Sequence, residues 1–296
     1  MECETCGWVP RCKFCDVSMT YHKKMNHLVC HYCGNTVTMP QTCQACGSPG
    51  LSTKGFGTEK IEEEIRLLFP ESRVSRMDYD TTRSKKSYQN IIAEFETGSV
   101  DILIGTQMVS KGLDFDRVSV VGILNADNML NIPDFRAFER SFQMIAQVSG
   151  RAGRKNKQGT VVLQTANPDH PIIQYVIHND YEGMYSTQIE ERQMFKYPPF
   201  YRLMHIMLRH KDKRTVDNAA ESLASRLRSI MGDRVLGPQE PPVSKVRNQY
   251  LTRIILKFEK GHAPSHVKKL VNDTINDILS TRQWRYVTVQ KDVDPM

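Results

Sequence analysis

Eight cysteines constrain this 296-residue chain more than any other feature, because all of them lie within the first 46 residues. They form four Cys-x-x-Cys pairs, Cys3/Cys6, Cys12/Cys15, Cys30/Cys33 and Cys43/Cys46. Each pair directs two sulfurs toward one point, and two pairs complete the tetrahedral four-thiolate site of structural zinc. The sequence therefore predicts two closed Zn²⁺ sites, which leave no open coordination position for a catalytic metal.

Other uses of these cysteines are less favoured. The chain opens without the basic start and apolar core of a signal peptide, so we expect a reducing cytosol, where disulfides are rare. A redox enzyme needs one Cys-x-x-Cys rather than four in series, whereas iron–sulfur ligation fits the ligands alone. The spacing leaves nested and crossed pairing of the pairs open, although the gap 16–29 suits a short hairpin. We expect the nearby His22, His27 and His31 to face solvent or nucleic acid.

Charge divides the chain into the same regions as the cysteines. Residues 1–53 have a net charge of +1, residues 54–194 of −3 and residues 195–296 of +9. Two four-thiolate zinc sites would each add a formal −2 and bring the first region to −3, so the basic excess belongs to the last region. We predict three domains with these bounds, and about 50 residues cannot bury a core without metal.

The middle region alternates helices and strands, as parallel α/β sheets do. We predict strands at 73–78, 101–105, 118–124 and 160–164, the second and third of them buried. Helices are expected from Thr58 as N-cap, with Ile61, Ile65 and Leu68 on one face, over 84–97, and over 135–152. Ligands in such sheets bind beyond the carboxyl ends of the strands.

Two segments follow strands or helices at this edge. The first runs Gly-Thr-Gln-Met-Val-Ser-Lys-Gly-Leu-Asp-Phe over 105–115, and the second runs Gln-Val-Ser-Gly-Arg-Ala-Gly-Arg over 147–154. The second could be a basic helix end that glycines terminate. Alternatively, Arg151 and Arg154 share a helix face and bind phosphate oxygens, while Gly150 and Gly153 let the backbone approach a partner.

Together the two segments resemble motifs V and VI of superfamily 2 helicases. With the cysteine pairs upstream, the chain resembles the C-terminal part of the PriA family of primosomal helicases over essentially its whole length, through Leu236-Gly-Pro and Asp292-Val-Asp-Pro. The resemblance implies an α/β fold, a RecA-like second helicase lobe that carries a two-zinc insertion with four cysteines at each zinc. It also implies nested pairing: Cys3, Cys6, Cys43 and Cys46 at one zinc, and Cys12, Cys15, Cys30 and Cys33 at the other.

The resemblance also implies roles for individual residues. Thr106, Gln107 and Lys111 would lie near the DNA backbone. The ATP cleft would include Gly112, Asp114 near the ribose, Gln147 between the lobes, and Gly150, Arg151, Gly153 and Arg154 near the γ-phosphate. Arg154 is the better candidate for an arginine finger, because positive charge there stabilises the transferring group. Asp114 as a turn residue and Gln147 as a helix-surface residue stay open.

No Gly-x-x-x-x-Gly-Lys-Ser/Thr loop occurs in the 296 residues, and no Asp-Glu pair follows a strand to hold Mg²⁺. In the family, the first RecA-like lobe and an N-terminal DNA-binding region precede the zinc region, so the chain is expected to be a C-terminal fragment. Phosphoryl transfer needs both walls of the ATP cleft. We therefore expect ATP and Mg²⁺ to serve the full-length protein, and the isolated chain to be inactive.

The last region begins after Pro198-Pro199. Its predicted order is strand 201–209, helix 215–231, strand 243–247, strand 251–258, helix 264–280 and strand 285–290, the βαββαβ plan of a ferredoxin-like α+β domain. Met204, Ile206 and Leu208 alternate on its first strand. The hairpin register decides whether Lys245, Arg247, Arg253 and Lys257 share one face. That face would bind nucleic-acid phosphates or be a solvated sheet face.

The favoured function is that of the C-terminal part of an ATP-dependent 3′–5′ DNA helicase in replication restart. The resemblance implies forked and single-stranded DNA, the tail of single-stranded-DNA-binding protein and other primosome proteins as partners, and the bacterial cytosol and nucleoid as its location. Two alternatives stay open: a zinc-ribbon nucleic-acid-binding module without motor activity, and an assembly scaffold.

Overall fold

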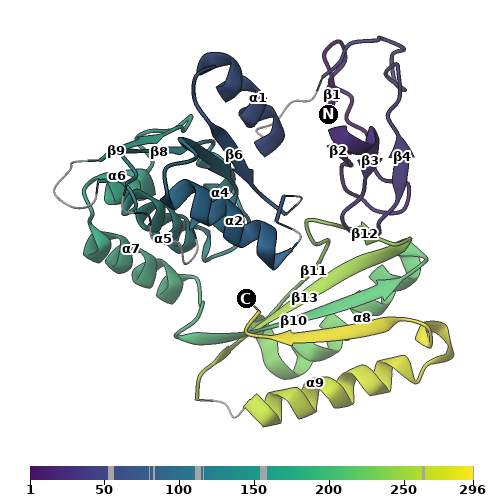
Figure 1. The fold of residues 1–296 in the computed structure, drawn as a ribbon. Coiled ribbons are helices and arrows are strands. Elements are labelled where there is room, and N and C mark those ends of the chain that lie inside the picture. The colour runs from purple at the N-terminus through teal and green to yellow at the C-terminus, as the bar shows by residue number, and fades with distance from the viewer. Residues whose placement is uncertain are drawn as a thin grey trace. The chain divides into compact units, whose positions relative to one another are not determined.

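A computed structural model describes residues 1–52, 57–79, 81–82, 84–110, 115, 117–153, 159–261 and 264–295. The chain divides into two compact units, one formed by Met1–Lys54 with Glu191–Met296 and the other by Gly55–Glu190. The first unit thus combines the cysteine region with the C-terminal domain (Figure 1). The three-domain division of the sequence stays a prediction. Among the described residues, no helix is both long and apolar enough to cross a membrane.

The cysteine region consists of short strands joined by tight turns. Its elements are β1 (Glu2–Cys3), β2 (Thr20–His22), the 3-10 helix η1 (Lys23–Met25), β3 (His27–Val29), β4 (Thr36–Thr38) and β5 (Leu51–Ser52). Strands β2, β3 and β4 form an antiparallel sheet, and β1 pairs with β5. The β2–β3 hairpin lies inside the gap 16–29, where the sequence predicts it.

The second unit alternates strands and helices as predicted. Its elements are α1 (Thr58–Leu68), β6 (Val74–Met77), α2 (Lys85–Glu96), β7 (Ile102–Gly105), α3 (Gln107–Ser110), β8 (Val120–Ile123), α4 (Asp127–Leu130), α5 (Ala137–Ser149), β9 (Thr160–Leu163), α6 (Pro171–Ile177) and α7 (Tyr181–Met194). Strands β6 and β7 pair in parallel, as do β8 and β9. The described residues show these as two separate pairs rather than one continuous sheet.

Side-chain periodicity explains α2 and the packing beneath it. Ser84 caps this helix by accepting a hydrogen bond from the Ser87 amide at 3.0 Å. Tyr88, Ile91, Ile92 and Phe95 recur at i, i+3, i+4 and i+7 along the helix predicted over 84–97, and they pack against the buried Met77 and Phe115. These contacts confirm the amphipathic helix and fix it over β6.

Two predictions in this unit are wrong. Thr58 does not cap α1: Gly57 occupies the N-cap, and the Thr58 hydroxyl instead donates to Asp78 Oδ2 at 2.6 Å. Strand β8 is not buried, since Val120 is 62% exposed, and Val162 on the paired β9 is 57% exposed. A continuous apolar run indicates a strand but does not say whether both of its faces are covered.

The C-terminal domain contains β10 (Tyr201–His210), α8 (Lys213–Met231), η2 (Gly232–Arg234), β11 (Val235–Gln239), β12 (Lys245–Val246), β13 (Gln249–Glu259), α9 (Pro264–Leu279), η3 (Arg282–Trp284) and β14 (Thr288–Val293). The antiparallel sheet has the order β11-β13-β10-β14, and β12 adds to β13. Figure 1 shows α8 and α9 together on one side of this sheet.

The core of this domain lies between that side of the sheet and the two helices. Met204, Ile206 and Leu208 of β10 are buried there, which confirms their predicted alternation. Ile254, Leu256 and Phe258 of β13 and the apolar stripes of α8 and α9 complete the cluster.

The prediction for the second strand of this domain is wrong. The strand that pairs with the middle of β13 is β11, while the predicted strand 243–247 is reduced to the two residues of β12. Gly237 and Pro238 fall inside β11, although both residue types usually interrupt a strand. Strand β11 tolerates them because it is an edge strand with a register shift between Leu236 and Gln239.

Candidate zinc centres and helicase motifs

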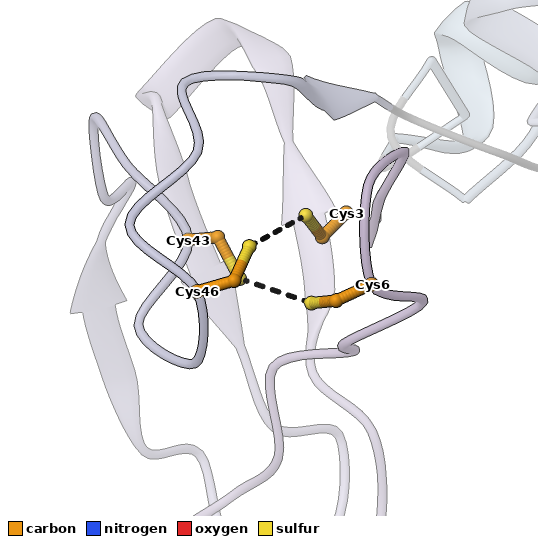
Figure 2. Close-up of side chains that lie close together, drawn as sticks. All are labelled: Cys3, Cys6, Cys43 and Cys46. Atoms are coloured by element: carbon orange, nitrogen blue, oxygen red, sulfur yellow. Dashed lines mark hydrogen bonds between the residues drawn. The ribbon is translucent and has the colours of Figure 1, made fainter.

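The outer cysteine group is formed by Cys3, Cys6, Cys43 and Cys46, whose sulfurs lie within 4.8 Å of one another. Figure 2 shows the pairs facing each other, with Cys3 Sγ 3.6 Å from Cys46 Sγ and Cys6 Sγ 3.7 Å from Cys43 Sγ. Zn–S bonds of about 2.3 Å in a tetrahedron place sulfurs roughly 3.8 Å apart. The group therefore fits zinc and is too open for a disulfide.

The inner group is formed by Cys12, Cys15, Cys30 and Cys33, again within 4.8 Å. Cys12 Sγ lies 3.6 Å from Cys33 Sγ. Both groups thus have the nested pairing, and the crossed alternative that the spacing left open does not occur. None of the three histidines joins either group; His22 and His31 instead pack edge to face, 5.5 Å apart.

Main-chain geometry shapes three of the four pairs in the same way. Gly7, Gly34 and Gly47 follow the second cysteine of their pairs at φ of 71°, 77° and 74°, a region that favours glycine. Their amides donate to the carbonyls of Cys3, Cys30 and Cys43 at 2.8–2.9 Å. Each turn is thereby closed with its two sulfurs on one side.

Main-chain amides also prepare the sulfurs for metal. Hydrogen bonds from the amides of Cys6 and Thr5 lower the pKa of the Cys3 thiol to about 6, against the effect of burial. Burial raises the pKa of Cys30, but the amides of Cys33 and Tyr32 outweigh it and lower the pKa to about 7. Because the thiolate is the zinc ligand, each group has one sulfur that ionises readily near neutral pH.

The two helicase-like segments lie close together in the second unit. The first leaves the end of β7 at Gly105, where a Cβ would lie 2.1 Å from Val109 Cγ2 and 2.7 Å from the Met77 carbonyl. Thr106 and Gln107 follow, both exposed, and α3 contacts α5, the helix that leads into the second segment. Lys111, Gly112 and Asp114 lie outside the described residues.

The second segment begins on α5 and continues beyond it. Gln147 is exposed on the last turn of the helix, and Gly150 is the C-cap. The half-buried Arg151 follows the helix rather than forming part of it, and the shared face of Arg151 and Arg154 stays a prediction. Gly153, at φ 71°, donates its amide to the Val118 carbonyl at 2.9 Å and ties the segment to the chain before β8. Arg154 lies outside the described residues.

The basic residues at 245, 247, 253 and 257 do not all lie on one face of the C-terminal sheet. Arg253 and Lys257 lie on the side of β13 away from the core. Lys245 is paired with Tyr250 and has its Nζ 5.5 Å from that ring, which places it on the other side. Arg247 lies in the turn between β12 and β13.

Lys257 is also engaged within the protein. Its Nζ donates to the Phe195 carbonyl at 2.7 Å and lies 3.6 Å from the centre of the Tyr197 ring. Burial, helped by the charge of Lys196, lowers the pKa of this ammonium. These contacts tie β13 to the segment that leads into the domain.

Sequence reasoning missed that the turn at Arg247 and Asn248 touches the inner cysteine group. The Arg247 amide donates to Cys15 Sγ at 3.3 Å, and the Asn248 amide donates to the Phe14 carbonyl at 2.8 Å. One signal was present: glycine follows three of the Cys-x-x-Cys pairs, but Asp16 follows the second.

Comparison with known proteins agrees with these features. Residues 12–37 match the PriA DNA helicase Cys-rich region, residues 54–156 the helicase conserved C-terminal domain, and residues 193–296 the primosomal protein N C-terminal domain. The chain therefore contains a helicase C-terminal domain and a zinc-type cysteine region.

Individual relatives indicate the family more specifically than these domain matches do. The chain is 38% identical to the replication restart protein PriA of Bacillus subtilis over 99% of its length, and 38% identical to that of Treponema pallidum over its whole length. It is 40% identical to PriA of Haemophilus influenzae over 86% of its length. The chain belongs to the PriA family of replication restart proteins. It spans 36%, 44% and 35% of these three relatives.

Proposed function

We propose that these residues are the C-terminal portion of an ATP-dependent 3′–5′ DNA helicase that recognises stalled or forked DNA and loads the primosome. The main supporting observation is the contact between α3, which lies in the segment that resembles motif V, and α5, the helix that leads into the segment that resembles motif VI. In this proposal the second unit is a RecA-like lobe, supported by its parallel strand pairs and connecting helices. The C-terminal domain is ferredoxin-like, supported by its sheet order β11-β13-β10-β14.

Each cysteine group would hold one structural Zn²⁺. Four thiolates close the coordination sphere, so the metal would supply folding energy rather than chemistry. ATP and Mg²⁺ would bind between this lobe and another, with Gly112, Asp114, Gln147, Gly150, Arg151, Gly153 and Arg154 on this side of the cleft. A guanidinium there would stabilise negative charge on the γ-phosphate.

DNA would contact Thr106, Gln107 and Lys111 beside the cleft, and the basic C-terminal domain through residues such as Lys245, Arg247 and Arg253. Forked and single-stranded DNA, the tail of single-stranded-DNA-binding protein and other primosome proteins are the proposed partners. The +9 charge of residues 195–296 supports attraction to phosphates and acidic segments.

An ATPase assay tests the motor assignment. The 296 residues contain no phosphate-binding loop sequence, so we expect no DNA-stimulated ATP hydrolysis from this chain alone. A full-length relative assayed beside it serves as the positive control. Turnover by the purified chain, at a rate that scales with its concentration, would refute this part of the proposal.

Binding to forked DNA at several salt concentrations tests the DNA contacts. Arg253→Gln should weaken binding and reduce the slope of log affinity against log salt by about one, because one phosphate contact is lost. Lys86→Gln, an exposed lysine on α2, removes the same charge and should leave the slope unchanged. Equal effects of the two substitutions would mean that Arg253 acts only through net charge. Absence of DNA binding by the unmodified chain would favour the scaffold alternative.

A further inference from the structure

The second Cys-x-x-Cys pair differs from the other three in how its turn is closed. In the other pairs the residue after the second cysteine is a glycine that donates its amide to the first cysteine of the same pair. The equivalent residue here is Asp16, whose amide donates to the carbonyl of Lys245 at 2.8 Å. In this pair, a carbonyl of the C-terminal domain is therefore the acceptor, whereas in the other three pairs the acceptor is the carbonyl of the pair's own first cysteine.

The sulfurs repeat this difference. The second cysteine of each other pair accepts a hydrogen bond from the amide two residues later, from Trp8 to Cys6, from Asn35 to Cys33 and from Ser48 to Cys46. At Cys15 the donor is the amide of Arg247, 3.3 Å from Sγ and 232 residues away in sequence. Such outer hydrogen bonds orient metal ligands and stabilise their charged form.

Further contacts hold the same hairpin against the cysteine region. The Asn248 amide donates to the Phe14 carbonyl at 2.8 Å, and the Ser244 hydroxyl donates to Asp16 Oδ2 at 2.9 Å. Val246 packs on the small apolar cluster around Met19 and Leu28. Polar and apolar contacts thus converge on one side of the inner group.

The hairpin has a conformation suited to this contact. Arg247 and Asn248 have φ of 50° and 61°, the left-handed values that a two-residue turn requires between the paired Val246 and Gln249. Amides in the tip of such a turn point away from their own sheet. Here both tip amides have acceptors in the cysteine region.

We propose that the inner zinc site is a clasp that joins the cysteine region to the basic C-terminal domain, and that it is complete only when the β12–β13 hairpin is docked. Arg247 is then a positioning residue that acts through its main-chain amide on the Cys15 thiolate. The outer site closes within its own region. Loss of the inner zinc would release the hairpin, and loss of hairpin docking would lower the zinc affinity of the inner site. This inference rests on the zinc binding proposed above.

Hydrogen exchange on the 296-residue chain tests the first direction. Cys30→Ser with Cys33→Ser removes the inner site without altering a residue that bonds to the hairpin, and amides in 244–250 should then exchange at least about tenfold faster. Cys43→Ser with Cys46→Ser removes the outer site and should leave these amides protected. Equal protection in both variants would overturn the clasp.

Zinc affinity tests the reverse direction in a chain with all eight cysteines. Val246→Asp puts a charge into the apolar contact and should weaken zinc at one of two sites by about 10- to 100-fold in chelator competition. Leu236→Asp puts the same charge on an exposed side chain of β11, away from the hairpin, and should change neither site. Two unchanged zinc affinities in Val246→Asp would refute the clasp alone, whereas an unmodified chain that binds no zinc would refute the zinc proposal itself.

Discussion

The cysteine region and the C-terminal domain lie in one compact unit but are stabilised by different means. The apolar cluster around the inner cysteines has five buried members, of which three are cysteines and only Met19 and Leu28 are ordinary apolar residues. The C-terminal domain buries eighteen apolar side chains in one cluster between its sheet and two helices. The first region must therefore depend on metal, whereas the second can depend on hydrophobic burial.

Metal removal should give the largest separation between the two. A structural zinc contributes about 10–16 kcal/mol of folding free energy near neutral pH, more than a whole domain's usual stability. We expect a strong chelator to unfold residues 1–52 while β10, β13, α8 and α9 stay folded. Limited proteolysis with mass spectrometry would locate the cleavage, and circular dichroism would follow the retained helix.

Addition of zinc to the chelated protein is the control, since it should restore protease resistance in the first region. Acidification should act in the same direction as the chelator, because protons compete with zinc for the thiolates. An intact N-terminal region after verified zinc removal would contradict the dependence on metal.

A cavity in the core of the C-terminal domain should destabilise that domain and leave the cysteine region unaffected. Phe258 on β13 is 1% exposed within the main cluster, so Phe258→Ala should cost about 3–5 kcal/mol of that domain's free energy of unfolding. Zinc content should stay at the unmodified value. Urea unfolding followed by the circular dichroism of α8 and α9 measures the loss.

Leu236→Ala on β11 is the matched control, because Leu236 is 42% exposed and its removal leaves little cavity. A loss for Phe258→Ala no larger than that of Leu236→Ala would show that this core does not carry the domain's stability.

The same contrast governs what could be predicted from the sequence. Metal ligands and helix stripes are local patterns, so the four Cys-x-x-Cys ligand pairs and α2 follow from spacing alone, and the parallel pairing of β6 with β7 agrees with the alternating plan. Nested pairing came from family resemblance, because the distances between pairs in the sequence fit both arrangements.

What failed depends on contacts between distant residues. Strand β11 was missed because only its edge position makes Gly237 and Pro238 tolerable. The prediction that β8 is buried was wrong because an apolar run does not specify what covers each face of the strand. The docking of Arg247 on Cys15 spans 232 residues, and its one local sign was Asp16 where the other pairs have glycine.

The smallest expected effect comes from the cap of α8, where electrostatics adds to the stability of the C-terminal domain. Asp212 accepts hydrogen bonds from the Thr215 hydroxyl and amide at 2.7 and 2.8 Å, and these bonds lower the pKa of its carboxyl. A depressed native pKa stabilises the fold above the unfolded value of roughly 3.9, and this contribution is lost as the pH falls below it. Asp212→Ala should therefore lower the Tm of the domain modestly at pH 7, with a difference that shrinks toward pH 3.

Asp233→Ala, which removes an equal charge from an exposed position, separates the cap from net charge. If the two substitutions shift Tm equally, or if the Asp212→Ala difference persists undiminished at pH 3, the carboxylate does not act as the cap. A Tm shift confined to Asp212→Ala would show that the cap of α8 stabilises the C-terminal domain. The zinc content of the cysteine region should be unchanged in both variants.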